Sequence, residues 1–572
     1  MEKINKLKQL LSYEKIDGYI ISKNDEFFGE YVPKFKDRLQ YISNFTGSSG
    51  FALILKNHNY LFVDGRYTLQ AEKQSNNYFK IITFPNRMPK DILKDKKLKL
   101  GFDPKIITKN FLNTFFKKLN ISFHPLKRNL VDEIWKRKNK INFKKFYILP
   151  ENSINQNFNS KINKIILNLK REKADYQFIT SCENCAWLLN IRGSDSDFTP
   201  IPHCYILISK KKDIIFFSDL KKITHKFKKK FKKIKFIDIN HTSKIISNIK
   251  KKNFIIDRNS CSLFFENLIS SRNKIKNFQD SIYSLKAIKT KKEIENMKKA
   301  HISDGSALTK YLFWIKNNFK KKKITEISAS QKLLDFRKKN KNYLFPSFPT
   351  ISGTGPNGAI IHYKPNKETN RRLKKGDIYL VDSGGQYKFG TTDVTRTISL
   401  ENSDKRIKKI FTRVLKGHIA VINYKLKKNT SGSEIDNAAR RFLKEINLDY
   451  AHGTGHGVGY FLNVHEGPHS ISKNNKILLS EGMIVSNEPG YYEKNKFGIR
   501  IENLIYINKS KKRKFFDNLT LVPIEKDLID KKLLNNFEKK WINSYHNKVF
   551  EKLKNNMDKN ELLQLKNACS AI

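Results

Sequence analysis

Two segments of the sequence place a carboxylate at the end of an apolar strand, interrupt the chain with glycine, and return with a second carboxylate. A hairpin brings the residues of its two strands side by side, so each segment predicts a pair of neighbouring acids. Four buried carboxylates cannot all remain ionised without cations, so the pattern predicts strands arranged around a cation site. The acids are Asp382 and Asp393 in GDIYLVDSGGQYKFGTTDVTRTISL, and Glu488 and Glu502 in EGMIVSNEPGYYEKNKFGIRIENLIYI.

A glycine-rich segment between them, AHGTGHGVGYFLNVHEGP, contains His452, His456 and His465, three of the 13 histidines in the chain. Such a cluster could simply be packing, but alternating glycines let the backbone come close to a neighbouring group and adopt φ values closed to other residues. Imidazole in this setting is typical of a metal ligand or a proton donor. Carboxylates with one imidazole suit Mn²⁺ or a similar ion, and four acids suffice to bridge two ions roughly 3.5–4 Å apart. Taken singly, each acid could instead be a turn or capping residue.

The order of these acids and His456 resembles the five-ligand signature of the pita-bread metallopeptidases. Longer stretches are similar to one group of that family, the Xaa-Pro aminopeptidases (aminopeptidase P) of the long, three-domain cytosolic type. The resemblance covers nearly the whole chain. The similar stretches are SFPTISGTGPNGAIIHYKP, GTTDVTRT, HGTGHGVGYFLNVHEGP, NEPGYY and FGIRIEN in the catalytic region, and EYVPKFKDRLQYISNFTGSSG, VDGRYTLQA, AWLLNIRGSD, NLTLVPIEKDLID and WINSYHNKV outside it.

The resemblance implies two divalent metal ions, usually manganese, and a role for each ligand. Asp382 would hold one ion and His456 with Glu488 the other, while Asp393 and Glu502 would bridge both. A bridging hydroxide would attack the scissile carbonyl. Glu488 would also move the proton.

The resemblance further implies that His362, His452 and His465 flank the substrate. His465 is the better candidate to stabilise the tetrahedral oxyanion or supply a proton, and His362 would do similar work from the other side. Arg500 lies two residues before Glu502 and therefore on the same strand face. We expect it to hold a ligand carboxylate.

Short strands and long helices mixed along the chain favour an α/β and α+β fold. The resemblance implies two creatinase-like N-terminal α/β domains followed by a C-terminal pita-bread metallopeptidase domain. The first two stretches could be related folds, although no sequence repeat connects them. The expected segments are residues 1–150 and 151–288 for the two N-terminal domains, 289–545 for the catalytic domain, and 546–572 for a helical tail.

The charge is strongly basic, with 113 Lys and Arg against 54 Asp and Glu and a net charge of +59. Such an excess favours nucleic-acid binding. The basic residues are mostly lysines, however, spread along a chain rich in Asn and Ile, as A/T-rich codons produce. We therefore interpret the charge as compositional and expect no specific nucleic-acid partner.

The apolar runs, the N-terminal segment and the cysteines all favour a cytoplasmic protein without membrane contact. No apolar run approaches the length of about 18 residues that a membrane span needs, and the N-terminus lacks the apolar core of a signal peptide. The five cysteines fit a reducing compartment. Cys182 and Cys185 form a CxxC, which could bind zinc or be redox-active; without a second CxxC we interpret it as structural.

The sequence thus predicts a manganese-dependent aminopeptidase, a homodimer, that removes the N-terminal residue from peptides with proline in second position. One alternative is a prolidase, which shares the metals but cuts only dipeptides. A second is a non-catalytic pita-bread protein that binds histones or nucleic acid. The presence of all five ligands speaks against the second alternative.

Overall fold

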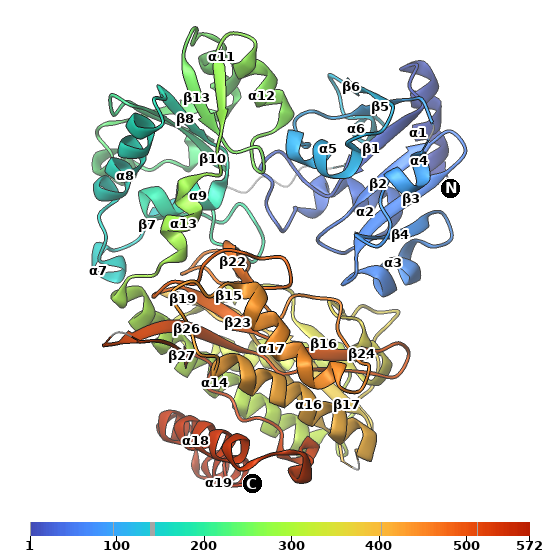
Figure 1. The fold of residues 1–572 in the computed structure, drawn as a ribbon, viewed down its shortest axis with the longest axis vertical. Helices are drawn as coiled ribbons and strands as arrows, with labels where there is room; N and C mark the ends of the chain where they lie inside the picture. Colours follow the sequence, from blue (N-terminus) through green and yellow to red (C-terminus); the bar gives the residue numbers. More distant parts are fainter. Residues whose placement is uncertain (1, 95, 138–143, 402, 512) are drawn as a thin grey trace. The chain divides into compact units, whose positions relative to one another are not determined.

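The computed structural model describes residues 2–94, 96–137, 144–401, 403–511 and 513–572. The chain forms two compact units, which Figure 1 colours from blue to green and from green to red. The first unit contains Met1–Glu151 and Gln156–Tyr283, and the second contains Asn152–Asn155 and Ser284–Ile572.

The first unit contains two six-stranded sheets with the same topology. The strand orders are β4-β3-β2-β1-β5-β6 and β12-β11-β10-β8-β13-β14. In the first sheet β3, β2 and β1 pair antiparallel, and in the second β11, β10 and β8 do so; the remaining neighbours pair parallel. The two stretches are therefore related folds, despite the lack of a visible sequence repeat. The strands are β1 Gly18–Ser22, β2 Phe51–Leu55, β3 Asn59–Asp64, β4 Lys80–Phe84, β5 Leu98–Phe102, β6 Ile121–Pro125, β8 Tyr176–Ile179, β10 Cys204–Ser209, β11 Ile214–Ser218, β12 Ile234–Asp238, β13 Asn253–Ile256 and β14 Lys274–Asn277, with the short pair β7 Tyr147–Ile148 and β9 Ile191–Arg192.

The apolar runs of β1 and β2 are buried at every residue, because helices cover both faces of their sheet. On one face Leu7 of α1 packs with Tyr19 and Ile21. On the other face Ile20 packs with residues of α5 such as Phe116. The helices of this unit are α1 Glu2–Tyr13, α2 Arg38–Ser43, α3 Thr68–Ser75, α4 Lys90–Leu93, α5 Lys109–Phe116, α6 Leu130–Ile134, α8 Phe158–Arg171, α9 Cys182–Leu189, α10 His225–Lys230, α11 Thr242–Ser247 and α12 Leu263–Ser270, with α7 Glu151–Ile154 and α13 Ser281–Ala287 at its borders.

The CxxC cysteines lie in the buried first half of α9. The thiol of Cys182 donates to the carbonyl oxygen of Cys204 at 3.3 Å, and that of Cys185 donates to the carbonyl oxygen of Ile179 at 3.6 Å. Burial raises the pKa of the Cys185 thiol. A buried, protonated thiol is inert, so these contacts fit the structural interpretation.

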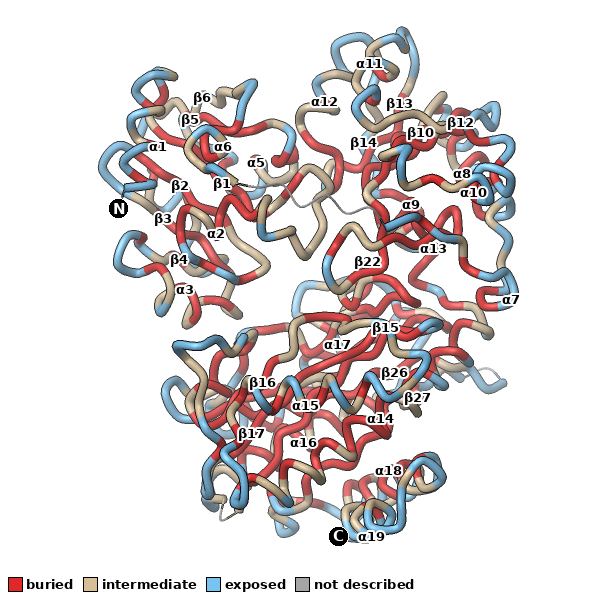
Figure 2. The backbone as a smooth tube through the Cα atoms, turned by 180° about the vertical axis from the view of Figure 1, so that it is seen from behind, coloured by how far each residue is buried: buried red, intermediate tan, exposed pale blue. Residues whose placement is uncertain are grey.

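In the described part of the second unit the strands form the sheets β16-β17-β20, β15-β18-β19, β22-β21-β23-β26-β27 and β24-β25. Helices α14, α16 and α17 lie across these strands, much of whose backbone is buried (Figure 1 and Figure 2). The strands are β15 Tyr343–Pro346, β16 Ile351–Thr354, β17 Ile378–Ser383, β18 Gly385–Tyr387, β19 Gly390–Thr391, β20 Val394–Ser399, β21 Gly455–Gly457, β22 Glu466–Ile471, β23 Ile484–Asn487, β24 Gly490–Glu493, β25 Phe497–Arg500, β26 Asn503–Ser510 and β27 Arg513–Asn518, and the helices are α14 Lys291–Asn318, α15 Glu326–Lys338, α16 Lys405–Ile422, α17 Gly432–Lys444, α18 Asn536–Leu553 and α19 Lys559–Ala568.

The long helix α14 begins at a capping box. The backbone N–H of Glu293 donates to the Thr290 hydroxyl at 3.2 Å, and the backbone N–H of Thr290 donates to the Glu293 carboxylate at 2.8 Å. Its buried side, with Leu308 and Ile315, packs against Tyr379 of β17. This packing supports the strand that carries Asp382.

The predicted boundary at residue 545 falls inside helix α18, because residues on both sides of it enter one core. Ile542 and Val549 are both fully buried there, with Ile378 of β17 in the same cluster. The expected domain boundaries, at 150, 288 and 545, stay predictions. Among the residues that the structure describes, no helix is long and apolar enough to cross a bilayer.

Candidate metal centre and active site

Asp382 and Asp393 lie at one end of an antiparallel strand pair, as the sequence predicts. Asp382 of β17 faces Thr395 of β20 in register, and Asp393 directly precedes β20. The connection is not a simple hairpin. Its strands β18 and β19 pair with each other, and β18 also pairs with β15, in a separate small sheet.

Glu488 and Glu502 repeat this arrangement. Strand β23 pairs with β26, with Asn487 opposite Asn503, so the two glutamates flank the last pair of this ladder. The hairpin β24-β25 is inserted between them. The two acid pairs meet where the Thr395 hydroxyl donates to Oε2 of Glu502 at 2.7 Å.

His456 of β21 presents one ring nitrogen to the acids. Its Nε2 lies 3.4 Å from Oδ2 of Asp393 and 3.4 Å from Oε1 of Glu488. Its Nδ1 is 2.9 Å from the carbonyl oxygen of Gly457, which fixes the tautomer that leaves Nε2 as a ligand. Ligand atoms of Asp393, His456 and Glu502 all lie within 4.8 Å of one another.

The alternating glycines serve close packing rather than unusual φ. A Cβ on Gly455 would lie 1.9 Å from the carbonyl oxygen of Ser486, and one on Gly457 would lie 2.1 Å from that of Glu466. Neither glycine adopts a positive φ. The expected close approach is therefore confirmed, but the expected unusual φ values are wrong.

Asp393 and Glu502 are buried, and the neighbouring carboxylates act on their pKa values. Burial raises the pKa of Asp393 to about 6, the charge of Asp382 adds to this rise, and a hydrogen bond with His456 opposes it. Burial and the neighbouring carboxylates raise the pKa of Glu502 well above its usual value. Burial opposes protonation of His456, but Asp393 and Glu488 raise its pKa to about 9. Part of the negative charge must therefore be neutralised by protons or cations.

The donor set fits divalent metal ions. Asp382 is only 8% exposed, and its Oδ1 has no hydrogen-bond partner among the described residues. A buried carboxylate oxygen without a partner is costly unless a cation binds it. Four carboxylates and one imidazole are ligands that Mn²⁺ and similar ions accept.

Arg500 holds the carboxylate of Asp382. Its Nη2 donates to Oδ2 of Asp382 at 2.6 Å, its Nε to the Thr395 hydroxyl at 3.0 Å, and its Nη1 to the Tyr492 hydroxyl at 2.6 Å. Thr395 and Tyr492 were not found by sequence reasoning. Each lies within a quoted motif, but neither is acidic or imidazole, so no local signal marked it.

The predicted histidines lie in different surroundings. The His465 ring packs edge-on against that of His456, with ring centroids 4.3 Å apart. Nε2 of His452 is 2.9 Å from the Tyr492 hydroxyl, so this histidine belongs to the network of Arg500. His362 is partly buried after the turn Gly355–Ala359, which packs against β25.

His469, to which sequence reasoning gave no role, packs against β23. Its Nε2 donates to the carbonyl oxygen of Ile484 at 2.9 Å, and burial lowers its pKa to about 3. It is therefore a neutral core histidine.

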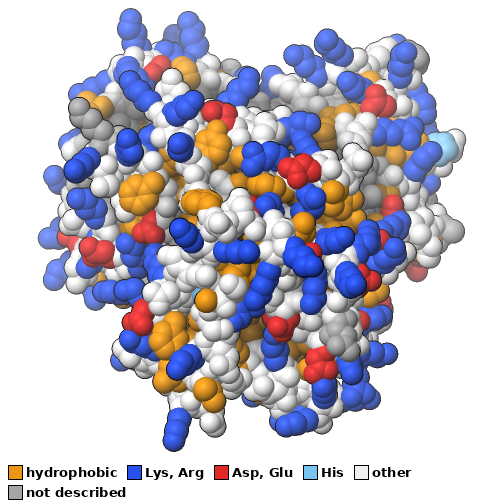
Figure 3. All heavy atoms as spheres, turned by 60° about the horizontal axis from the view of Figure 1, so that its bottom comes forward, with side chains coloured by type: hydrophobic (Ala, Val, Ile, Leu, Met, Phe, Trp, Pro, Cys, Tyr) orange, Lys and Arg blue, Asp and Glu red, His pale blue; other side chains and the backbone are white. Residues whose placement is uncertain are grey.

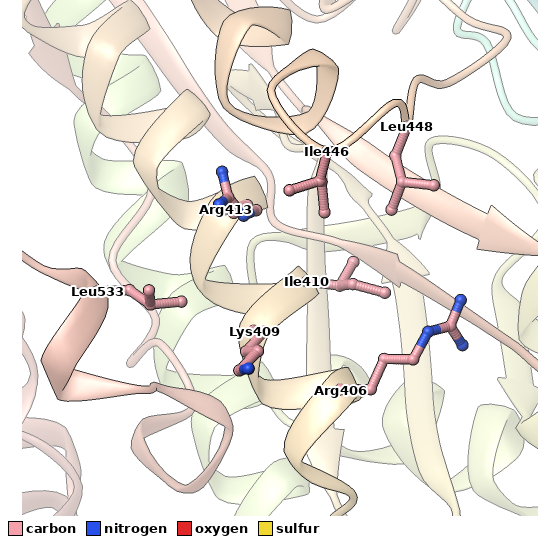
Figure 4. A pocket seen from close by; sticks show the side chains of 7 residues that line it. All are labelled: Arg406, Lys409, Ile410, Arg413, Ile446, Leu448 and Leu533. Carbon is pink, nitrogen blue, oxygen red and sulfur yellow. The ribbon is translucent and has the colours of Figure 1, made fainter.

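A cavity of about 400 Å³ against α16 is separate from these residues (Figure 4). Arg406 pairs with Glu493 and Arg413 with Glu445, so the two arginines of its wall are already neutralised. None of the predicted site residues lines it. Its walls are Arg406, Lys409, Ile410, Arg413, Ile446, Leu448 and Leu533.

Comparison with known sequence families matches every part of the chain. Residues 295–509 match the metallopeptidase family M24, and residues 514–572 match the C-terminal region of that peptidase. Residues 3–134 and 137–293 each match the creatinase/prolidase N-terminal domain. These matches confirm the predicted fold class, two creatinase-like domains followed by a pita-bread domain.

Individual relatives agree over their full length. The probable Xaa-Pro aminopeptidase P of Laccaria bicolor is 36% identical over 96% of this chain and 90% of its own. The Xaa-Pro aminopeptidase 1 of Dictyostelium discoideum is 36% identical over 96% and 93%. The crystal structure of X-prolyl aminopeptidase from Caenorhabditis elegans, described as a cytosolic enzyme with a di-nuclear active site, is 30% identical and superposes with a TM-score of 0.95 over 100% of this chain and 99% of its own.

Prolidase from Pyrococcus furiosus shares the fold, with 24% identity, a TM-score of 0.51 and coverage of only 62% of this chain. The relatives that are similar over nearly the full length of this chain are Xaa-Pro aminopeptidases. The cluster of acids with His456 in this chain agrees with a metallopeptidase. The chain belongs to the metallopeptidase family M24, and within it to the Xaa-Pro aminopeptidases.

Proposed function

We propose that this enzyme hydrolyses the bond between the N-terminal residue of a peptide and a proline in second position, using two divalent metal ions that are Mn²⁺ in the cell. The observation that carries the proposal is the cluster of four acids and His456, in which Oδ1 of Asp382 lacks a partner among the described residues. The full-length similarity to Xaa-Pro aminopeptidases gives the substrate class.

In this proposal Asp382 would hold one ion, His456 with Glu488 would hold the second, and Asp393 and Glu502 would contribute to both. When bound, such a pair of cations lowers the pKa of water to near neutrality and polarises a carbonyl. The packing of three of these residues supports the assignment, because Asp393 and Glu502 are 4% and 1% exposed and lie together with His456.

The chain's own groups keep these ligands in place. Ser486 donates from its hydroxyl to Oε1 of Glu488 at 2.9 Å and accepts the backbone N–H of His456 at 2.9 Å. One serine therefore orients two ligands of the second ion. Glu488 is partly exposed, with 17% of its side chain accessible, which suits the proposed role in moving a proton.

The proposed substrate-facing groups are His362, His452 and His465. His465 would donate a hydrogen bond to the oxyanion or give a proton to the leaving nitrogen. His452 is engaged by the Tyr492 hydroxyl, and this contact would orient its ring beside the substrate.

The experiment that tests the function compares Gly-Pro, Gly-Pro-Ala and Gly-Ala-Ala with purified protein and Mn²⁺. We expect cleavage of Gly-Pro-Ala with kcat/KM at least equal to that of Gly-Pro, because an aminopeptidase leaves the pocket open beyond the proline. We expect Gly-Ala-Ala to be a poor substrate, because a pocket shaped for the rigid ring places the scissile bond correctly. Cleavage of the dipeptide alone would identify a prolidase, and equal cleavage of all three would refute proline specificity.

Manganese, a cytoplasmic location and a homodimer complete the proposal. The related C. elegans enzyme, described as cytosolic, supports the location. Metal analysis of protein purified without added metal tests the ion. Light scattering during gel filtration tests the dimer, which would show twice the mass of one chain.

The basic surface is expected to have no specific nucleic-acid function. In Figure 3 Lys and Arg side chains are scattered over the visible face rather than gathered in one stripe. Duplex DNA should bind weakly and lose that binding steeply between about 0.05 and 0.2 M salt, without changing turnover. Fluorescence anisotropy measures this, and tight, sequence-selective binding at about 0.15 M salt would contradict it.

A further inference from the structure

Arg396 is a buried cation directly behind the acid cluster. It is 1% exposed, and the acceptors of its hydrogen bonds among the described residues are all neutral oxygens. Its Nη1 donates both to the carbonyl oxygen of Thr395 at 2.8 Å and to that of Glu502 at 2.7 Å. Its Nη2 donates to Oδ1 of Asn503 at 2.8 Å. One guanidinium thus joins the backbone of both acid-bearing strand pairs.

The hydrogen bonds of Arg396 hold the backbone beside two proposed metal ligands, Asp393 and Glu502. The backbone N–H of Glu502 also donates to the carbonyl oxygen of Thr395 at 3.2 Å, and the Thr395 hydroxyl holds Oε2 of Glu502. Asp393 lies three residues before Arg396. A shift of the guanidinium would therefore move the start of β20 and the backbone of Glu502 together.

The far side of Arg396 is held by the C-terminal region. The two N–H groups of Nη2 are shared between Asn503, the Tyr545 hydroxyl of α18 at 2.9 Å and the carbonyl oxygen of Val522 at 2.8 Å, and Nε donates to the carbonyl oxygen of Pro523 at 3.0 Å. The Tyr545 hydroxyl donates to the carbonyl oxygen of Val522 at 2.8 Å. Helix α18 therefore fixes both Arg396 and the loop that surrounds it.

A second contact from α18 reaches the same loop. The backbone N–H of Ile524 donates to Nε2 of His546 at 3.1 Å. The Tyr545 ring is stacked on that of Trp541, with centroids 5.4 Å apart and planes 3° apart. The hydroxyl of Tyr545 is thus held in one position by a rigid helix.

We propose that Tyr545 and Arg396 are positioning residues, through which the C-terminal helix sets the placement of Asp393 and Glu502 and so the affinity of the site for divalent cations. This inference rests on the proposed function, because it takes these two acids as metal ligands. It assigns a role to the region after residue 514 that does not require contact with the substrate.

The test is Tyr545→Phe, which keeps the ring packing and removes only the hydroxyl. Residues that orient metal ligands typically change affinity by about 10–100-fold when they are altered. We expect the Kd for Mn²⁺, measured by equilibrium dialysis with elemental analysis, to rise about 10-fold. Turnover should return toward the wild-type value at saturating Mn²⁺, because the ligands themselves are intact.

The matched control is Tyr506→Phe on β26. Tyr506 is 4% exposed, like Tyr545, and its hydroxyl donates to Asp517 at 3.0 Å without contact to Arg396. Tyr506→Phe also removes a tyrosine hydroxyl and its hydrogen bond, so its Kd for Mn²⁺ should stay at the wild-type value even where its melting temperature falls.

A second variant, Arg396→Lys, keeps the charge but cannot span the same acceptors. We expect it to raise the Kd more than Tyr545→Phe does. If it fails to fold, the result for Tyr545→Phe decides alone. Wild-type Kd in Tyr545→Phe would overturn the inference, whatever its melting temperature. Wild-type protein that binds no Mn²⁺ or does not cleave Gly-Pro-Ala would instead refute the proposed function.

Discussion

Asp393→Asn is expected to abolish peptidase activity and to lower the metal content of the purified protein. Asp393 is 4% exposed, and its Oδ2 lies 3.4 Å from Nε2 of His456. In the proposed site it contacts both ions, so the neutral amide removes charge and one ligand oxygen from both at once. The loss should therefore exceed that of any residue that contacts one ion only. Elemental analysis and turnover of Gly-Pro-Ala measure the two effects.

The control for this substitution is Asp404→Asn. Asp404 is the exposed N-cap of α16, where its side chain accepts the backbone N–H of Arg406. Asn caps a helix as well as Asp does, so this variant makes the same chemical change and should keep both metals and normal activity. An Asp393→Asn protein with two metals per chain and normal turnover would show that the bridging assignment is wrong.

His456→Ala and His465→Ala are expected to fail in different ways, although their rings are in contact. His456→Ala should reduce metal occupancy, because its Nε2 faces Asp393 and Glu488. His465→Ala should keep the metals and lose mainly kcat. Removal of one oxyanion donor typically costs about 10²–10³ in rate. Metal analysis with kcat and KM for Gly-Pro-Ala separates the two outcomes.

Each variant is the control for the other, since both remove an imidazole from the same glycine-rich segment. Loss of a metal in His465→Ala would mean that the two roles are exchanged. An unchanged kcat in His465→Ala would remove this residue from the reaction and leave His362 as the candidate donor.

The sequence determined the parts of the site that depend on neighbours along the chain. In each of two segments a strand ends at an acid, glycine interrupts the chain, and a returning strand brings a second acid. Because antiparallel pairing follows from this strand pattern, it predicted Asp382 beside Asp393 and Glu488 beside Glu502. Glycines at alternate positions predicted the close backbone contacts around His456. Resemblance then supplied the identity of the ligands and of the family.

Tertiary structure alone decided which partners these residues meet. Arg500 was expected to hold a carboxylate, but that this carboxylate belongs to Asp382, 118 residues earlier, follows only from the packing of β25 on β17. The contacts of Arg500 with Tyr492 and Thr395, and the hydrogen bond between Arg396 and Tyr545, also depend on tertiary packing. Helix α18 crosses residue 545 for a related reason, since a helix continues as long as its buried face meets a core. Local pattern sets the period and the turns of the chain, whereas a hydrogen bond between distant side chains exists only where the folded strands bring donor and acceptor within reach.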